Sequence, residues 1–144
     1  MSPLSRRLLD ATTPRGKHIL SRLKREIVIW LVTTNPNGGP LVVPVWFLFD
    51  GKTFLIHSVP GQKVRNIEGN PLVALHLNSN REGGDVVRVT GKAQLPKRQP
   101  PAYKVPAYLR KYRSLIKSYG WTPESFSADY RIPIRVRPTK FQGD

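Results

Sequence analysis

The feature that most constrains this chain is a pattern repeated between residues 26 and 58, in which a short apolar stretch is followed by a tight turn. The turns, NPNGG and DGK, have the glycine and asparagine content of hairpin connections. Strands joined by such short turns pair antiparallel, because a parallel pair needs a long crossover. Three stretches rich in β-branched and aromatic residues are expected to be these strands: EIVIWLVTT (26–34), LVVPVWFLFD (41–50) and TFLIHS (53–58).

Three further segments continue the pattern: LVALHLN (72–78), the alternating DVVRVTGKAQL (85–95) and RIPIRVRP (131–138). The stretch at 26–34 is apolar almost throughout, which predicts a strand buried on both faces. Pro44 interrupts the stretch at 41–50 and indicates an edge strand, a bulge or a missing ladder hydrogen bond. Six strands with few helices predict a mainly β fold, either an antiparallel barrel or a sandwich.

Apolar residues at helical spacing appear in a few other segments. RGKHILSRLKR at 15–25 is expected to be an amphipathic helix with Thr13 as its N-cap, and leucines before it allow one more turn. A longer helix is expected at 102–119, where Gly120 ends it, and a short helical turn is expected from Pro123.

The 144 residues correspond to one domain. The absence of Cys excludes disulfides, thiolate metal sites and cysteine nucleophiles. We expect a cytoplasmic protein without membrane contact, because no apolar run could cross a bilayer or serve as a signal peptide. The domain divides into an N-terminal helical segment (1–25), a barrel core (26–95), a helical region (102–129) and a closing strand (130–141).

The charge balance is strongly basic. Lys and Arg number 24 against 9 Asp and Glu, which gives a net charge of +15. This favours an anionic partner, although a solvated surface explains part of it. The basic aromatic segment YLRKYRSLIKSYGW suits nucleic-acid stacking, or more simply an amphipathic helix that covers the barrel.

The segment SVPGQKVRNIEGNP (58–71) is polar, yet it lies between two expected strands. It predicts a helix of one to two turns at about 61–68, with Gly69 as its C-cap. Val64 and Ile67 are three residues apart and share a face that would anchor this helix to the core.

Lys63 and Asn66 share another face of the expected helix, and Ser58 ends the preceding strand. A hydroxyl, an ammonium group and an amide beside the free N–H groups of a helix start are the donors of a phosphate site. An exposed connecting turn with ordinary polar residues explains the same pattern, and spacing alone slightly favours this simpler interpretation.

Several other positions are each open to more than one interpretation. Backbone groups beside Pro44 are either free to meet a heterocyclic ligand or belong to an ordinary edge strand. Trp46 suits the core, a dimer interface or a stacking surface. His57 and His76 either face each other across neighbouring strands or make ordinary hydrogen bonds within the sheet.

No motif of an acid–base pair, catalytic triad, phosphate loop or dinucleotide site is present, and the histidines lack metal-ligand spacing. An enzyme with this sequence would therefore take its chemistry from a bound cofactor.

In combination, WLVTTNPNGGPLVVPVWFLFDGKTFLIHS, KVRNIEGNPLVALHL and GGDVVRVTGKAQL closely resemble the pyridoxamine-5′-phosphate-oxidase-like split β-barrel family. YGWTPESFSADYRIPIRVRPTKFQG resembles its subgroup of oxidoreductases that depend on the deazaflavin coenzyme F420. The resemblance covers about 26–141, and its most specific piece is K-V-R-N-x-x-x-N-P after V-P-V-W-F. It implies a six-stranded, FMN-binding-like split barrel with peripheral helices, and a homodimer with cofactor sites across the interface.

The resemblance also implies roles for individual residues. Ser58, Lys63 and Asn66 match the cradle of the cofactor's phosphate. Gln62 and Arg65 border this cradle. Those matching the strand along the flavin-type ring are Pro44, Val45 and Trp46. His57 joins the expected cofactor contacts, and Trp121 and Arg135 are expected to reach the site from the other subunit.

Vitamin B6 oxidation is not expected, because the chain lacks the longer Arg- and His-containing C-terminal segment that holds the pyridoxal substrate in true oxidases of that kind. The leading hypothesis is an oxidoreductase that uses F420 to transfer hydride to or from a small unsaturated organic substrate, with FMN as the alternative cofactor. A non-catalytic flavin- or tetrapyrrole-binding module is the second hypothesis. A nucleic-acid-binding barrel is the third hypothesis. It ranks last because it assigns no role to the segment KVRN at 63–66.

Overall fold

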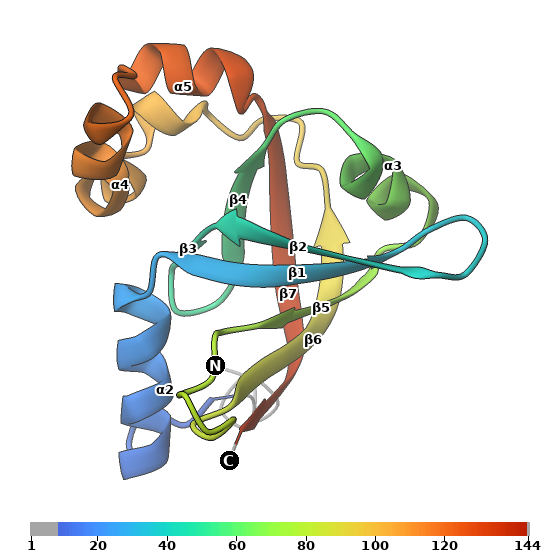
Figure 1. Cartoon of the computed structure of the whole chain (residues 1–144), viewed down its shortest axis with the longest axis vertical. Helices are drawn as coiled ribbons and strands as arrows, with labels where there is room; N and C mark the ends of the chain where they lie inside the picture. The colour runs from blue at the N-terminus through green and yellow to red at the C-terminus, as the bar shows by residue number, and fades with distance from the viewer. Residues whose placement is uncertain (1–8, 144) are drawn as a thin grey trace.

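The structure is a computed structural model that describes residues 9–143 and shows a curled antiparallel sheet with short helices around it (Figure 1). The extra helical turn expected around Leu4 and Leu8 lies outside these residues. The helices are α2 (Pro14–Arg25), α3 (Gln62–Gly69), the 3-10 helix η1 (Ala102–Lys104), α4 (Pro106–Ser118) and α5 (Pro123–Asp129). The strands are β1 (Val28–Thr34), β2 (Pro40–Trp46), β3 (Leu48–Phe49), β4 (Phe54–Ser58), β5 (Leu72–His76), β6 (Val87–Gln94) and β7 (Ile132–Gly143).

The order of strands shows that the sheet forms a split barrel. All paired strands are antiparallel, and the order is β2-β1-β5-β6-β7-β4-β3. Only Phe47 separates β2 from β3 in sequence, yet these strands lie at opposite ends of the order. The sheet must therefore curl until its two edges meet at Phe47. No ladder joins β2 to β4 in the described chain, so the barrel is split between these two strands.

The stretch expected as one strand at 41–50 is two strands, which raises the number of strands from six to seven. The break occurs at Phe47, whose N–H donates to the hydroxyl of Tyr112 over 2.8 Å instead of to a neighbouring strand. Pro44 lies on β2, which is an edge strand, as one of its interpretations predicted. β7 continues to Gly143, past the end expected for the last strand.

The prediction that the first strand is buried on both faces is wrong for this chain. Along β1, buried side chains alternate with half-buried ones, so only one face is in the core. The strand buried on both faces is β4, whose five residues are all buried. Barrel core residues cover one side of it, and on the other side His57 packs against Tyr108 of α4.

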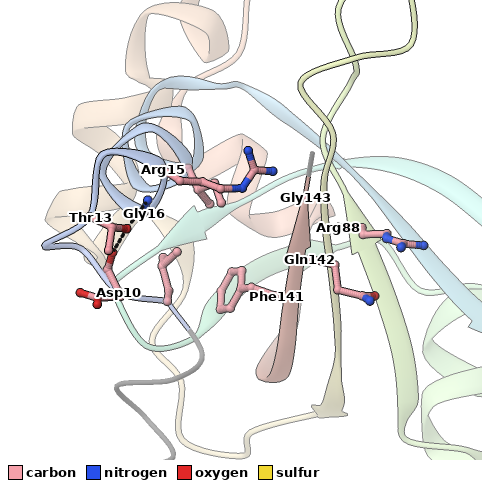
Figure 2. A pocket seen from close by; sticks show the side chains of 10 residues that line it. Asp10, Thr13, Arg15, Gly16, Arg88, Phe141, Gln142 and Gly143 are labelled. Atoms are coloured by element: carbon pink, nitrogen blue, oxygen red, sulfur yellow. Dashed lines mark hydrogen bonds between the residues drawn. The ribbon is translucent and has the colours of Figure 1, made fainter.

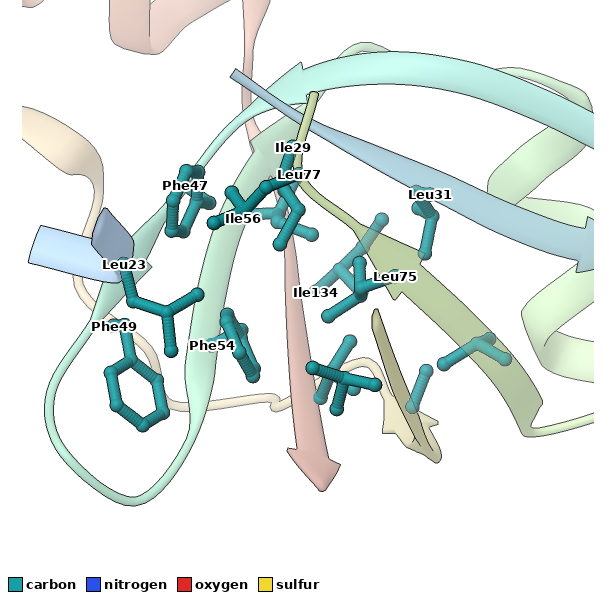
Figure 3. Close-up of a cluster of buried hydrophobic side chains, with 14 of the residues drawn as sticks. Leu23, Ile29, Leu31, Phe47, Phe49, Phe54, Ile56, Leu75, Leu77 and Ile134 are labelled. Atoms are coloured by element: carbon teal, nitrogen blue, oxygen red, sulfur yellow. The ribbon is translucent and has the colours of Figure 1, made fainter. Parts of the chain in front are cut away.

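The main core fills the inside of the curled sheet with aliphatic and phenylalanine side chains, as Figure 3 shows. Leu23 of α2 and Ile134 of β7 are among its fully buried members. Val64 and Ile67 also belong to this core, which confirms that their shared face anchors α3. α3 is therefore held at a fixed position beside the end of β4.

A second, largely aromatic cluster joins α4 and α5 to the outer side of the barrel. Trp46 stacks on Tyr112 with 4.8 Å between ring centroids, and on Phe126 with 5.4 Å. The hydroxyl of Tyr112 also lies 2.6 Å from the carbonyl oxygen of Ile27, to which it donates. α4 is therefore fastened both to the start of β1 and to the break after β2.

The helix expected at 102–119 consists of two pieces, η1 and α4. Pro106 lacks an N–H group and favours an extended conformation for Val105, which separates the two helices. α2 begins as predicted, because the Thr13 side chain accepts a hydrogen bond from the N–H of Gly16. No helix within residues 9–143 is long and apolar enough to cross a membrane.

Candidate functional site

A cavity of about 520 Å³ opens at the split between β2 and β4. Its volume is within the range of small-molecule and cofactor sites. The residues that line it are Val28, Pro44, Val45, Trp46, His57, Ser58, Val59, Lys63, Tyr119, Trp121, Phe126 and Tyr130. The cavity thus brings together seven of the residues expected to contact a cofactor: Pro44, Val45, Trp46, His57, Ser58, Lys63 and Trp121.

The alternation of side chains along β4 gives this cavity two unlike walls. Successive residues of a strand point to opposite faces. Ile56 points into the barrel core, so Ser58 lies on that same face, close to α3. His57 points the other way and meets the ring of Tyr108. One wall is therefore formed by the end of β4 and α3, and the opposite wall by aromatic residues.

Lys63 places a positive charge in the wall formed by α3. Its side chain is half-buried, and burial lowers the pKa of Lys63 from its ordinary value. No Asp or Glu lines the cavity, and Lys63 makes no ion pair within residues 9–143. A partly desolvated cation without a counter-charge favours an anionic ligand.

The start of α3 adds backbone donors to this wall. No side chain caps the helix at Gly61. The first N–H groups of a helix have no partner within it, and its dipole makes this end positive. The hydroxyl of Ser58 donates to the carbonyl oxygen of Val59 over 2.6 Å, so it must rotate before it can donate to a ligand. Ser58, Lys63 and the helix start provide the donors of a phosphate site.

Asn66 does not line the cavity, contrary to the expectation that it faces a phosphate beside Lys63. Its side-chain NH₂ donates to Thr33 Oγ1 over 3.0 Å and to Asn35 Oδ1 over 2.9 Å. Its Oδ1 accepts from Gln62 over 2.8 Å. α3 packs so that the face with Asn66 is covered, and the amide becomes a buried link to β1 and the turn after it.

Gln62 and Arg65, the other two expected contacts, also lie outside the cavity lining. Arg65 is exposed and donates to Gln62 Oε1 over 2.9 Å, so the two side chains brace α3. The helix runs through Gly69, and its C-cap is Asn70 rather than the glycine. The N–H of Asn70 still donates to the Asn66 carbonyl, which extends the helical ladder by one residue beyond the expected end.

His57 is a buried, neutral group in the opposite wall. Only 5% of it is exposed, and burial, assisted by the positive charge of Arg135, lowers the pKa of His57 to about 4. Its Nε2 atom is buried without a hydrogen-bond partner among the described residues. The ring meets Tyr108 edge to face with 4.9 Å between centroids, and the Tyr108 hydroxyl is likewise buried and unpaired.

His57 and His76 do not face each other, because β6 and β7 separate their strands in the sheet. His76 stacks on Trp30 of the neighbouring strand at 6.1 Å. Arg135 lies on β7, where it donates to Thr53 Oγ1 over 2.6 Å, and it does not line the cavity. Within residues 9–143, no group of three or more His, Cys, Asp or Glu side chains could hold a metal ion.

The aromatic wall contains residues that sequence reasoning did not assign to the site, namely Tyr119, Phe126 and Tyr130. The chain reverses at Gly120, which has a φ of +76°, and the N–H of Trp121 donates to the carbonyl of Ile116. Trp121 therefore lines the cavity from the same chain. The dense aromatic residues at 119–130 were the signal for this wall.

Two other cavities contain none of the expected site residues. One of about 430 Å³ lies beside the start of α2 and the end of β7, with Arg15, Arg88 and Phe141 in its wall (Figure 2). The other, of about 570 Å³, lies on the outer side of η1 and α4 and is lined by Tyr103 and Arg110, among others. The cavity at the split is thus distinguished by its residues and not by its volume.

Comparisons with known proteins agree on the fold. The sequence model of pyridoxamine 5'-phosphate oxidase matches residues 16–142. A solved F420 reductase is 30% identical, with a TM-score of 0.61, and the match covers 85% of this chain and 94% of that one. An FAD-binding protein from Mesorhizobium loti is 17% identical, with a TM-score of 0.60 and coverages of 88% and 89%. The heme storage protein HutZ from Vibrio cholerae is 15% identical, with a TM-score of 0.57 and coverages of 85% and 88%. No curated protein matches the sequence.

Proposed function

Because the chain belongs to the pyridoxamine 5'-phosphate oxidase family, we propose that it is an oxidoreductase that binds coenzyme F420 in the cavity at the split. The observation that carries this proposal is Lys63, a half-buried cation without a counter-charge at one wall of a cavity whose other wall is aromatic. The 30% identity to an F420 reductase supports the deazaflavin over FMN, which is the alternative cofactor.

The residues of the cavity suit the parts of such a cofactor. Lys63, Ser58 and the N–H groups at the start of α3 would hold its phosphate group. The edge of β2 from Pro44 to Trp46 would lie along its ring system. The ring supplies the hydride chemistry, whereas the chain supplies position, charge and a wall that excludes water from a small unsaturated substrate.

Titration of the purified protein with F420, and separately with FMN, tests the proposal through quenching of cofactor fluorescence. We expect F420 to bind with a micromolar or lower Kd and to bind more tightly than FMN. Dissociation constants weaker than about 1 mM for both cofactors would overturn the proposal, whereas tighter binding of FMN would transfer it to the alternative cofactor.

The same titration tests the role of Lys63. Lys63→Ala removes a charge-assisted hydrogen bond and is expected to weaken F420 binding by about 10- to 100-fold. The matched control is Lys92→Ala, which removes the same charge from an exposed position on β6. Equal effects of both variants would show that only the overall positive charge matters.

A binding module without turnover is the second candidate, because no carboxylate lines the cavity and His57 is neutral. Mixing the protein with reduced F420 and a series of activated alkenes and quinones distinguishes the two functions. Protein-dependent oxidation of F420, followed by absorbance, is expected of the oxidoreductase. Tight binding without oxidation would favour the module.

We also propose a homodimer formed through the outer face of β1, β2 and β5. Val42 and Leu72 are large apolar side chains that are 48% and 58% exposed. Val32 pairs in register with Val42 on one side and with Ala74 on the other, so the apolar surface continues across three strands. A contiguous exposed apolar surface of this kind is typical of an interface.

Sedimentation velocity tests the dimer. The protein is expected to sediment as a dimer, and Val42→Glu is expected to produce monomers because it places a charge within the apolar face. Ser114→Glu, on the exposed side of α4, makes a similar charge change elsewhere and serves as the control. A monomeric protein at high concentration would refute the proposal.

A further inference from the structure

The outer face of β6 and β7 carries cations that the proposed function does not use. Along β6, buried residues alternate with exposed ones, and Arg88 and Lys92 belong to the exposed set. On β7 the exposed cations are Arg137 and Lys140. These four side chains, which we call the cationic track, lie outside the lining of the cavity at the split.

Cross-strand pairing arranges these cations in rows. Residues directly opposite each other in an antiparallel ladder point to the same face of the sheet. Three successive outward-facing rows contain the pairs Arg88–Gln142, Thr90–Lys140 and Lys92–Arg137. Figure 2 shows Arg88 and Gln142 projecting to one side of the sheet and Phe141 to the other. Each row therefore contains at least one cation.

A β-bulge is needed to complete these rows. Arg137 and Lys140 are three residues apart, so a regular strand would point them to opposite faces. The register shifts between Thr90 and Gly91, which leaves Thr139 without a partner in the ladder. The extra residue restores Lys140 to the exposed face on which Arg137 lies.

The track lacks the carboxylates that balance other cations of this protein. β6 and β7 contain no Asp or Glu, and the four cations form no ion pair within residues 9–143. The next row ends the track, because Arg135, opposite Gln94, pairs with Asp50 over 3.6 Å. Like charges directly opposite each other, such as Lys92 and Arg137, destabilise a ladder. An uncompensated set of cations of this kind favours an anionic partner.

The shape of this face limits the kind of anionic partner. The main core fills the inside of the curled sheet, so the outer face is convex. A convex face meets a flat membrane along only a narrow line, whereas a flexible polymer can follow it. Outward-facing rows recur about every 7 Å, because each residue of a strand rises about 3.4 Å and alternate residues share a face. Regularly spaced cations match a linear polymer with one negative charge in each repeating unit.

We propose that the cationic track binds the phosphate backbone of single-stranded nucleic acid without reading its sequence. This is a second binding activity, and it does not depend on the proposed function. The phosphates accept hydrogen bonds from the four cations, and Thr90 and Gln142 add uncharged donors to the same rows. The outer face of these two strands has no aromatic side chain on which a base could stack. Binding through phosphates alone is independent of sequence and strongly dependent on salt.

Fluorescence anisotropy with a labelled oligothymidylate of about 20 nucleotides tests the proposal in the full-length protein. We expect a Kd of about 10 µM at about 50 mM NaCl. Four phosphate contacts on a single strand predict that the logarithm of the binding constant falls with the logarithm of the salt concentration with a slope of about −3. Undetectable binding at low salt, or a slope near zero, would overturn the proposal.

Two double variants that remove the same charge assign the binding to the track. Lys92→Gln combined with Arg137→Gln is expected to weaken binding about 10-fold and to reduce the steepness of the salt dependence by about 1.4. Arg110→Gln combined with Arg113→Gln removes two exposed charges from α4. This control is expected to change the Kd by less than about 3-fold, because it alters only the long-range field. Equal losses in both double variants would overturn the proposal.

Amide NMR spectra of the wild-type protein provide a test that does not require the variants to fold. The oligothymidylate is expected to shift the resonances of β6 and β7 more than those of α4, and the opposite order would overturn the proposal. Phosphatidylserine vesicles distinguish a membrane from a nucleic acid. If the double variant at Lys92 and Arg137 lost affinity for these vesicles but bound the oligothymidylate normally, the track would be a membrane-binding surface and the proposal would be wrong.

Discussion

Burial of His57 couples the stability of the fold to pH. The ordinary pKa of a histidine in an unfolded chain is about 6.5, whereas that of His57 in the fold is about 4. Between these values the unfolded chain binds a proton that the folded chain does not. The stability associated with neutral His57 is therefore fully present above about pH 6.5 and is lost as the pH falls towards 4. The difference in pKa corresponds to about 3 kcal/mol.

Substitution of His57 by Gln is expected to remove this part of the pH dependence. The free energy of unfolding of the wild-type protein should fall by about 3 kcal/mol more than that of His57→Gln between about pH 7 and pH 4. Urea unfolding of both proteins at a series of pH values measures the difference, and the carboxylates common to both cancel. Parallel pH profiles would show that His57 titrates normally in the fold.

At the scale of secondary structure, Tyr112 connects three elements. Its hydroxyl accepts from the Phe47 N–H at the end of β2 and donates to the Ile27 carbonyl before β1, while its ring lies on α4. Tyr112→Phe is expected to lower the free energy of unfolding by about 1–3 kcal/mol, because it leaves buried backbone groups unpaired. Urea denaturation measures this loss. The exposed control Tyr103→Phe should change little, and an equal change in both would argue against the connection.

Asn66 connects α3 to β1 and to the turn after it through two hydrogen bonds, to Thr33 and to Asn35. Asn66→Ala is expected to lower the free energy of unfolding by about 1–3 kcal/mol and to speed hydrogen exchange in α3. Hydrogen exchange followed by mass spectrometry measures the local effect. Glu68→Ala, on the exposed side of the same helix, is the control. Unchanged exchange in α3 after Asn66→Ala would show that the helix is held by Val64 and Ile67 alone.

At the scale of the whole molecule, the net charge of +15 opposes the compact state. The ion pairs within residues 9–143 involve few of the 24 Lys and Arg residues: His18–Asp85, Arg22–Glu26, Arg22–Asp85 and Arg135–Asp50. Raising NaCl from about 20 mM to about 300 mM screens the repulsion and is expected to raise the Tm by roughly 4 °C. A Tm that falls with salt in a thermal scan would show that the ion pairs outweigh the repulsion.

The sequence by itself determined the features that depend on a few neighbouring residues. Turn residues and β-branched stretches located the strands, Thr13 and Gly120 marked helix ends, and the spacing of Val64 and Ile67 placed α3 on the core. Each of these depends on backbone preferences and side-chain periodicity, which act over one or two turns of chain. Spacing of this kind pointed to Ser58 and Lys63, whereas the full set of seven expected residues in the cavity came from the resemblance to a known family.

The tertiary structure alone decided which way the functional side chains point. The strand expected at 41–50 breaks at Phe47 because Tyr112, 65 residues away, satisfies its backbone. Asn66 turns into the protein because Thr33 and Asn35 lie beneath it, and the aromatic wall forms where α5 folds back over the split. These outcomes depend on contacts between distant segments, and no local preference of the chain contains that information.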